Sequence, residues 1–134
     1  MSIQPFDWKT YFQLAQELGA RTEEACLRSS LSRAYYYVYN IALIRAKQNG
    51  FNTIPGESTH KQLWRIYNES PDPDCSQLGQ IALRLKQKRE KADYEGIYRR
   101  IEEEVPAVLQ EAQDFAARLE RLASRFPNPS SVRW

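Results

Sequence analysis

Ser32-Arg33-Ala34-Tyr35-Tyr36-Tyr37-Val38-Tyr39-Asn40 is the stretch of this 134-residue chain that decides the fold. On a helical wheel, apolar residues spaced three or four positions apart share one face: Leu27, Leu31, Ala34, Val38, Ile41 and Ala42. The opposite face is also apolar, with Tyr36, Tyr37, Leu43 and Ile44, so we expect other helices to cover both faces. Arg33 and Asn40 lie on this second face, where half-buried polar groups have to be paired or take part in chemistry.

Capping residues delimit the helices in the first half of the chain. We expect Asp7 to cap a short amphipathic helix that ends at Gly19. The long central helix then runs from about residue 22 to residue 49, with Gly50 directly after it. Ser58 is expected to cap a third helix, which carries apolar and aromatic residues at helical spacing.

Two further helices fill the second half. We expect a fourth helix from about Ser76 to near Lys91, followed by a turn at residues 93–96. The last helix is expected from about residue 103 to residue 125, with Pro106 in its first turn, where proline is best tolerated.

The chain shows no strand-like alternation and no internal repeat. It therefore predicts an all-α, up-and-down bundle of about five helices in one domain, residues 1–126, with a flexible tail at 127–134. No run of about 18 apolar residues occurs, and the N-terminus lacks a charged start followed by an apolar segment, so we expect a soluble cytoplasmic protein without membrane contact. Cys26 and Cys75 are too few for a disulfide framework and are expected to be free thiols.

Basic residues gather in one region, although the net charge is only +2. The region contains Arg84, Lys86, Lys88, Arg89, Lys91, Arg99 and Arg100, and an acidic segment follows it. Such a pattern forms either a phosphate-binding surface or a pair of solvated faces that neutralise each other. On the first alternative, Lys88 is a candidate for binding phosphate.

Most enzyme signatures are missing from the sequence. It contains no glycine-rich phosphate loop, no paired CxxC, no HExxH and no nucleophile elbow. The single histidine, His60, follows Glu57 by three residues, but Glu57 is expected in a loop, which does not suit a carboxylate-bridged metal pair. We therefore expect no metal and no cofactor.

Four polar residues are candidates for chemistry. Arg89 and Asp93 lie one helical turn apart and are expected to form a charge-assisted pair, with Tyr94 next in sequence. His60 lies near the start of a helix, where the helix dipole favours the neutral imidazole that acts as a base. Plainer alternatives stay open: an ion pair that ends a helix, a hydrogen-bonded surface histidine, and tyrosines that belong to the core.

Three short motifs resemble the HEPN family of small helical prokaryotic proteins. They are Ser32-Arg33-Ala34-Tyr35-Tyr36 on the long helix, Thr59-His60 opening the third helix, and Arg89-Glu90-Lys91-Ala92-Asp93-Tyr94 closing the fourth. The resemblance covers roughly residues 8–122. It implies an up-and-down bundle, a homodimer built around the second and fourth helices, and pairing with a minimal nucleotidyltransferase in toxin and antitoxin modules. Many members are metal-independent endoribonucleases.

The chain departs from the catalytic members of that family at one position. Those members carry an arginine that holds the scissile phosphate and, four to six residues later, a histidine that moves the proton of the attacking 2′-hydroxyl. Here Arg89 is followed after four residues by Tyr94, and no histidine follows. A tyrosine of ordinary pKa is ionised to only about one part in a thousand at pH 7, so either nearby cations lower that pKa or His60 supplies the proton step.

The residues thus leave three functions open. In the first, the chain is an RNA-directed protein, a toxin or a degenerate endoribonuclease, in which Arg33 and Arg89 hold phosphate. In the second, it is a non-catalytic dimeric module that docks an acidic protein or a nucleotidyltransferase-type antitoxin, and the same arginines with Asn40 fix helix register. In the third, it binds a nucleotide whose base stacks on Tyr36 or Tyr94.

Overall fold

The structure, a computed structural model, describes residues 4–122 and contains five helices and no strand in that range. The helices are α1 (Lys9–Gly19), α2 (Glu24–Gln48), α3 (Thr59–Asn68), α4 (Pro73–Tyr94) and α5 (Ile101–Leu122). The predicted all-α bundle is therefore confirmed. The tail expected at 127–134, and the domain end expected at residue 126, lie outside the described residues.

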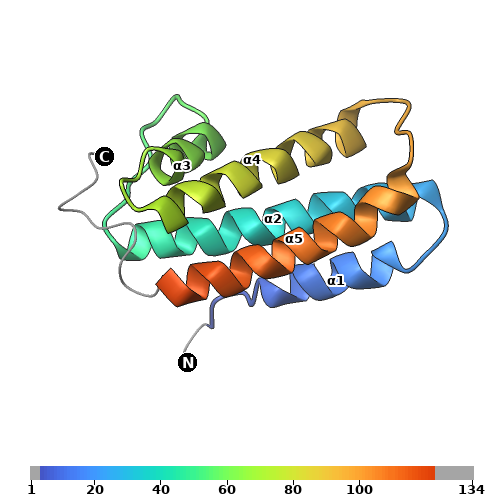
Figure 1. The fold of residues 1–134 in the computed structure, drawn as a ribbon, viewed down its shortest axis with the longest axis horizontal. Coiled ribbons are helices and arrows are strands. Elements are labelled where there is room, and N and C mark those ends of the chain that lie inside the picture. The colour runs from blue at the N-terminus through green and yellow to red at the C-terminus, as the bar shows by residue number, and fades with distance from the viewer. Residues whose placement is uncertain (1–3, 123–134) are drawn as a thin grey trace.

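Helix α2 is the centre of the bundle. It contacts each of the other four helices, as its apolar circumference predicts. Figure 1 shows α1, α2, α4 and α5 alternating in direction along the long axis, with α4 on one side of α2 and α1 and α5 on the other. The short α3 packs mainly against α4 near the end of the bundle where α4 begins. Within residues 4–122, no helix has the length and hydrophobicity of a membrane span.

Burial along α2 follows the predicted face closely but not completely. Ala34, Val38 and Ala42 have no exposed surface, and Tyr35 joins them in the core. By contrast, Ile44 is 44% exposed, so the expectation that neighbours cover both faces along the whole helix is wrong near its end. The reason is the shortness of α1: its first residue, Lys9, lines the same cavity as Ile44, and no further turn of α1 extends past it.

Side-chain caps set the first residues of the helices. The Ser58 hydroxyl accepts a hydrogen bond from the backbone N–H of Lys61, as predicted for an α3 cap. The Asp7 carboxylate accepts from the N–H of Lys9, although the N-cap position of α1 belongs to Trp8. Helix α4 begins at Pro73 and not near Ser76, because the Asp72 carboxylate caps it and proline is favoured in a first turn.

Helix α4 also ends later than the sequence predicts. Asp93 and Tyr94 belong to its last turn and not to a turn after it. The cause is Arg28 of α2, whose guanidinium donates to the carbonyl oxygens of Ala92 (2.9 Å), Glu95 (2.5 Å) and Gly96 (3.3 Å). These carbonyls at and just beyond the helix end receive a cation from another helix, which stabilises the extra turn.

Helix α5 starts two residues before the predicted position. Arg100 adopts a left-handed conformation with φ of 59°, and the helix begins at Ile101 directly after it. Pro106 consequently lies in the second turn and not in the first. Its ring leaves the carbonyl of Glu102 without the usual helical donor, and the exposure of both residues leaves that carbonyl accessible to water.

The contact between α3 and α4 gives a test of the fold. A Cβ at Gly79 of α4 would lie 2.7 Å from Oδ1 and 2.9 Å from the backbone nitrogen of Asn68 in α3. We expect Gly79→Ala to lower the free energy of unfolding by about 1–3 kcal/mol in urea denaturation, despite the higher helix propensity of alanine. Gly96→Ala is the matched control, because a Cβ there meets nothing within 4 Å. Equal stabilities of the two variants would contradict this packing.

Candidate functional site at the meeting of α2, α3 and α4

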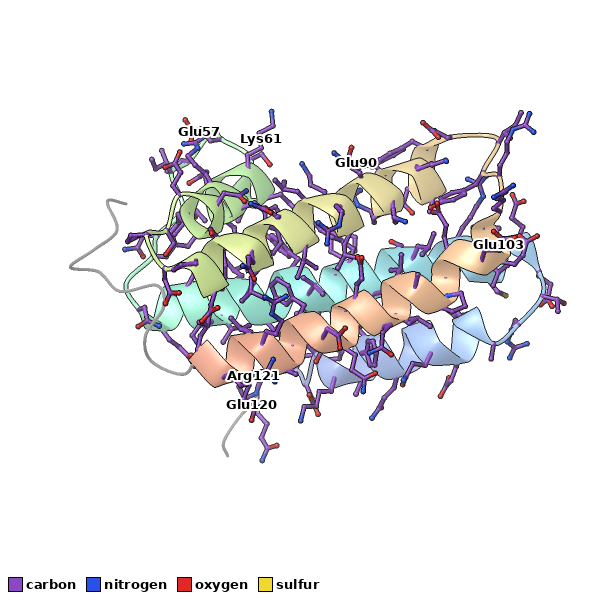
Figure 2. The ribbon with its side chains drawn as sticks, in the orientation of Figure 1. Glu57, Lys61, Glu90, Glu103, Glu120 and Arg121 are labelled. Carbon is purple, nitrogen blue, oxygen red and sulfur yellow. The ribbon has the colours of Figure 1, made fainter. Side chains whose placement is uncertain are left out.

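Side chains from three helices meet beside the aromatic run of α2. Tyr35 and Tyr36 come from α2, His60 from the first turn of α3, and Arg89 from the last two turns of α4. Figure 2 shows that Lys61 and Glu90, the sequence neighbours of His60 and Arg89, project at the same edge of the molecule. Residues that lie 29 positions apart in sequence are therefore brought to one place.

The hydroxyl of Tyr35 ties α2 to α3. Its oxygen lies 2.6 Å from Nδ1 of His60 and accepts a hydrogen bond from the indole N–H of Trp64 at 3.0 Å. The Tyr35 side chain has no exposed surface, so this oxygen depends on protein partners. Burial raises the pKa of Tyr35 well above its usual range, and the phenol therefore stays protonated at neutral pH.

His60 is packed between aromatic rings. Its imidazole stacks on Tyr39 with ring centroids 3.9 Å apart, and the Tyr36 ring meets it edge-on at 5.9 Å. Burial, together with the positive charges of Arg89 and Lys86, lowers the pKa of His60 to about 4. The imidazole is thus neutral at pH 7, as its place near the start of a helix predicts.

Arg89 is the most deeply buried charged side chain of the described residues, with 7% of its surface exposed. Its guanidinium carbon lies 5.3 Å from the ring centre of Tyr35 and 5.5 Å from that of Tyr36. The Nη1 atom is 3.5 Å from a carboxylate oxygen of Asp93, which confirms the predicted pair. The Nε atom is buried and has no hydrogen-bond partner within residues 4–122. One donor of this buried cation is therefore left unsatisfied within the described part of the chain.

Loose ion pairs surround this guanidinium. Glu90 lies 4.0 Å from Arg89 and 3.4 Å from Lys86, and the Asp93 carboxylate also accepts from the Ser32 hydroxyl at 3.5 Å. Both carboxylates are partly exposed, and both contacts to Arg89 are longer than a good charge-assisted hydrogen bond. An incoming anion therefore competes with only weak contacts from these two carboxylates.

The other predicted site residues are distributed unevenly. Tyr94 lies at the rim, 77% exposed, with its ring 6.0 Å from the guanidinium carbon of Arg89. Lys88 lies outside the cluster, because its ammonium group pairs with Glu104 of α5 at 3.6 Å. Arg33 and Asn40 line a separate hollow that shares only Tyr36 with the cluster.

Sequence reasoning missed Tyr35, Tyr39 and Lys86. Lys86 lies three residues before Arg89 and thus on the same face of α4, a spacing that was available in the sequence. Tyr35 and Tyr39 are four residues apart on α2 and flank His60 by the same rule. Helical spacing alone does not identify which of the consecutive tyrosines contacts His60, because neighbouring residues point only 100° apart around the helix.

No known protein helps to interpret this geometry. No family model matches the chain, and no characterised protein or solved structure matches it either. Residues 4–122 also contain no group of three or more histidine, cysteine or carboxylate side chains suited to hold a metal ion. Any function has to be argued from the cluster itself.

The low pKa of His60 gives a pH test. In the unfolded chain a histidine titrates near 6.5, whereas in the folded protein this one titrates at about 4. Between these values the unfolded state binds more protons, so the contribution of His60 to stability is present above pH 6.5 and is lost as the pH falls to about 4. We expect His60→Gln to be less stable than the parent protein by about 1 kcal/mol at pH 7, and the difference to shrink on acidification and change sign as the pH approaches 4.

Urea denaturation of both proteins between pH 4 and pH 7 measures that difference. Carboxylates that titrate in the same pH range are present in both proteins, so their contributions cancel in the difference between the two free energies of unfolding. A difference that stays constant with pH would show that the folded protein does not hold His60 neutral.

Proposed function

We propose that this protein is an RNA-directed member of the HEPN type, in which Arg89 and His60 form one metal-independent phosphodiester site. The supporting observation is the convergence of the two residues. A histidine from the start of α3 and a buried arginine from the end of α4 lie against the same tyrosines of α2. This arrangement supplies from two helices the arginine and histidine that catalytic members of the family carry in one motif.

Arg89 holds the phosphate in this proposal. Its planar fork of donors matches the oxygens of a phosphodiester, and its Nε atom has no partner within the described residues. The weak contacts to Asp93 and Glu90 give way to the phosphate at the exposed side. Lys86 adds a second positive charge next to the bound anion.

His60 acts on the proton of the ribose 2′-hydroxyl. At rest the Tyr35 hydroxyl donates to Nδ1 of His60, since its oxygen already accepts from Trp64; Nε2 becomes the proton acceptor when the imidazole shifts to the tautomer with hydrogen on Nδ1 and that N–H donates to the Tyr35 oxygen. A phosphate bound at Arg89 offsets the positive charges that lower the pKa of His60, so the imidazole becomes a stronger base when RNA is present. The 2′-oxygen then attacks phosphorus, the bond to the 5′-oxygen breaks, and that oxygen takes a proton from water.

RNA cleavage in the presence of EDTA tests this function. We expect the parent protein to cleave single-stranded RNA and to leave a 2′,3′-cyclic phosphate and a 5′-hydroxyl end. Removing the phosphate-binding group in Arg89→Ala and the base in His60→Gln should each lower the rate about 100-fold or more. The matched control is Arg84→Ala, which removes one positive charge from an exposed position of the same helix.

Circular dichroism of each variant separates loss of activity from loss of fold. Full activity of the folded Arg89→Ala variant would contradict the proposed site. Absence of cleavage and of RNA binding by the parent protein would contradict the function as a whole.

A second candidate is a non-catalytic module that pairs with a second copy or with a nucleotidyltransferase-type partner. One observation favours it: Tyr94, the last residue of α4, and Ile97, in the segment after it, are 77% and 72% exposed, so apolar surface is left uncovered there. In that case Arg89 and Asp93 hold the end of α4 in position and do no chemistry.

Sedimentation equilibrium distinguishes the two candidates. If the module alone is correct, Ile97→Ser weakens self-association at least tenfold while RNA is neither bound nor cleaved. A monomeric parent protein at 100 µM would remove the homodimer from consideration.

A further inference from the structure

A second hollow lies next to the Arg89 and His60 cluster. It has a volume of about 330 Å³ and is lined by side chains from the start of α1 and from α2: Trp8, Tyr11, Arg33, Tyr36 and Asn40. Tyr36 is common to both places, since its ring also lies 5.5 Å from the guanidinium carbon of Arg89. The hollow and the cluster therefore meet at this one side chain.

Arg33 gives the hollow a positive charge without a counter-ion. Its guanidinium lies over the Tyr11 ring, 5.1 Å from the ring centre. Among residues 4–122 it has no carboxylate within salt-bridge distance and no hydrogen-bond acceptor. A half-buried guanidinium that lies over an aromatic ring and has no ion-pair partner is suited to receive an anion from outside.

The remaining walls suit a flat polar ring. Trp8 supplies an aromatic wall, and its ring meets those of Phe6 and Tyr11 in T-shaped contacts with centroids 4.7 and 4.9 Å apart. The Asn40 amide is oriented by a hydrogen bond from Nδ2 to the carbonyl of Tyr36 at 2.7 Å. Its Oδ1 atom has no partner in the described part of the chain and is available to an amino group.

We propose that this hollow binds one unpaired nucleotide of an RNA strand, with the adjacent phosphate lying at Arg89. Arg33 holds the phosphate of that nucleotide, its base stacks on the aromatic wall at Trp8, and Asn40 accepts a hydrogen bond from an amino group of the base. This inference rests on the proposed function of the Arg89 and His60 site and adds the nucleotide next to the reacting phosphate.

The shape of the hollow favours a single strand over a duplex. A base reaches an aromatic wall only when it is unstacked and unpaired, which the bases of a double helix are not. A free nucleotide offers the same phosphate and base, but it gains nothing from Arg89 on the other side of Tyr36. The strand that spans both arginines is therefore the expected ligand.

Fluorescence anisotropy with end-labelled oligo(A) of eight nucleotides, made with 2′-deoxyribose to prevent cleavage, tests the proposal. We expect Trp8→Ala to raise the Kd about tenfold, the effect of losing one base stack. Arg33→Gln should raise the Kd and also lower the slope of log Kd against log salt by about 0.7, the contribution of one phosphate contact on a single strand. Arg65→Gln, which removes an exposed charge from α3, is the matched control and should leave both quantities unchanged.

The outcomes separate this inference from the function on which it rests. If Arg89→Ala loses binding but Trp8→Ala and Arg33→Gln bind as the parent protein does, the hollow is not part of the site, whereas the phosphodiester site stands. If AMP stabilises the protein in a thermal shift and competes fully with oligo(A) at equal affinity, the hollow is a free-nucleotide site and the strand is ruled out. If the parent protein cleaves RNA but does not bind the 2′-deoxy oligo(A), the hollow is ruled out as a strand site while the phosphodiester site stands; if it neither cleaves nor binds RNA, both proposals fail.

Discussion

The hydroxyl of Tyr35 is the constraint on which the arrangement of three helices depends. It lies at the centre of α2 with no exposed surface, and leaving such a group without a partner would cost about 1–3 kcal/mol. Trp64 and His60, both from α3, satisfy it and thereby fix how α3 docks on α2. The guanidinium of Arg89 lies over the same ring, so the Tyr35 side chain also contacts α4. One buried phenol thus couples the packing of the bundle to the geometry of the candidate site.

The electrostatics of the site follow from this packing. Burial and two neighbouring cations keep His60 neutral, while Arg89 remains charged because aromatic faces and partly exposed carboxylates surround it. The proposed anion would replace the long contacts that Asp93 and Glu90 make to Arg89. The pKa of His60 then becomes dependent on whether the anion is bound. This coupling is the physical reason for proposing chemistry and not only a structural role.

The fold was largely predictable because apolar periodicity is a local property. The spacing along residues 27–42 gave a central helix that is covered on several sides, and α2 has that place. Helix ends were less predictable, since the last turn of α4 depends on Arg28, a residue 64 positions before Ala92. No pattern near Asp93 and Tyr94 carries that information.

Some contacts of the candidate site were likewise predictable from the sequence, and others were not. Pairing of Arg89 with Asp93 is one helical turn and was predictable from spacing. That His60 and Arg89 lie against the same tyrosines depends on tertiary packing. Tertiary packing also places Arg33 and Asn40 in the separate hollow beside α1. Lys88 was a reasonable candidate by charge, but its face of α4 turns toward Glu104, whereas Lys86 lies near His60.

The most direct test of the coupling between Arg89 and His60 is the pKa of His60 measured by NMR, with and without bound 2′-deoxy oligo(A). The account predicts a value of about 4 in the free protein and a rise of at least one unit on binding, because the phosphate offsets the charges of Arg89 and Lys86. A pKa that is unchanged at saturating oligonucleotide would contradict the claim that the two residues share one phosphate site.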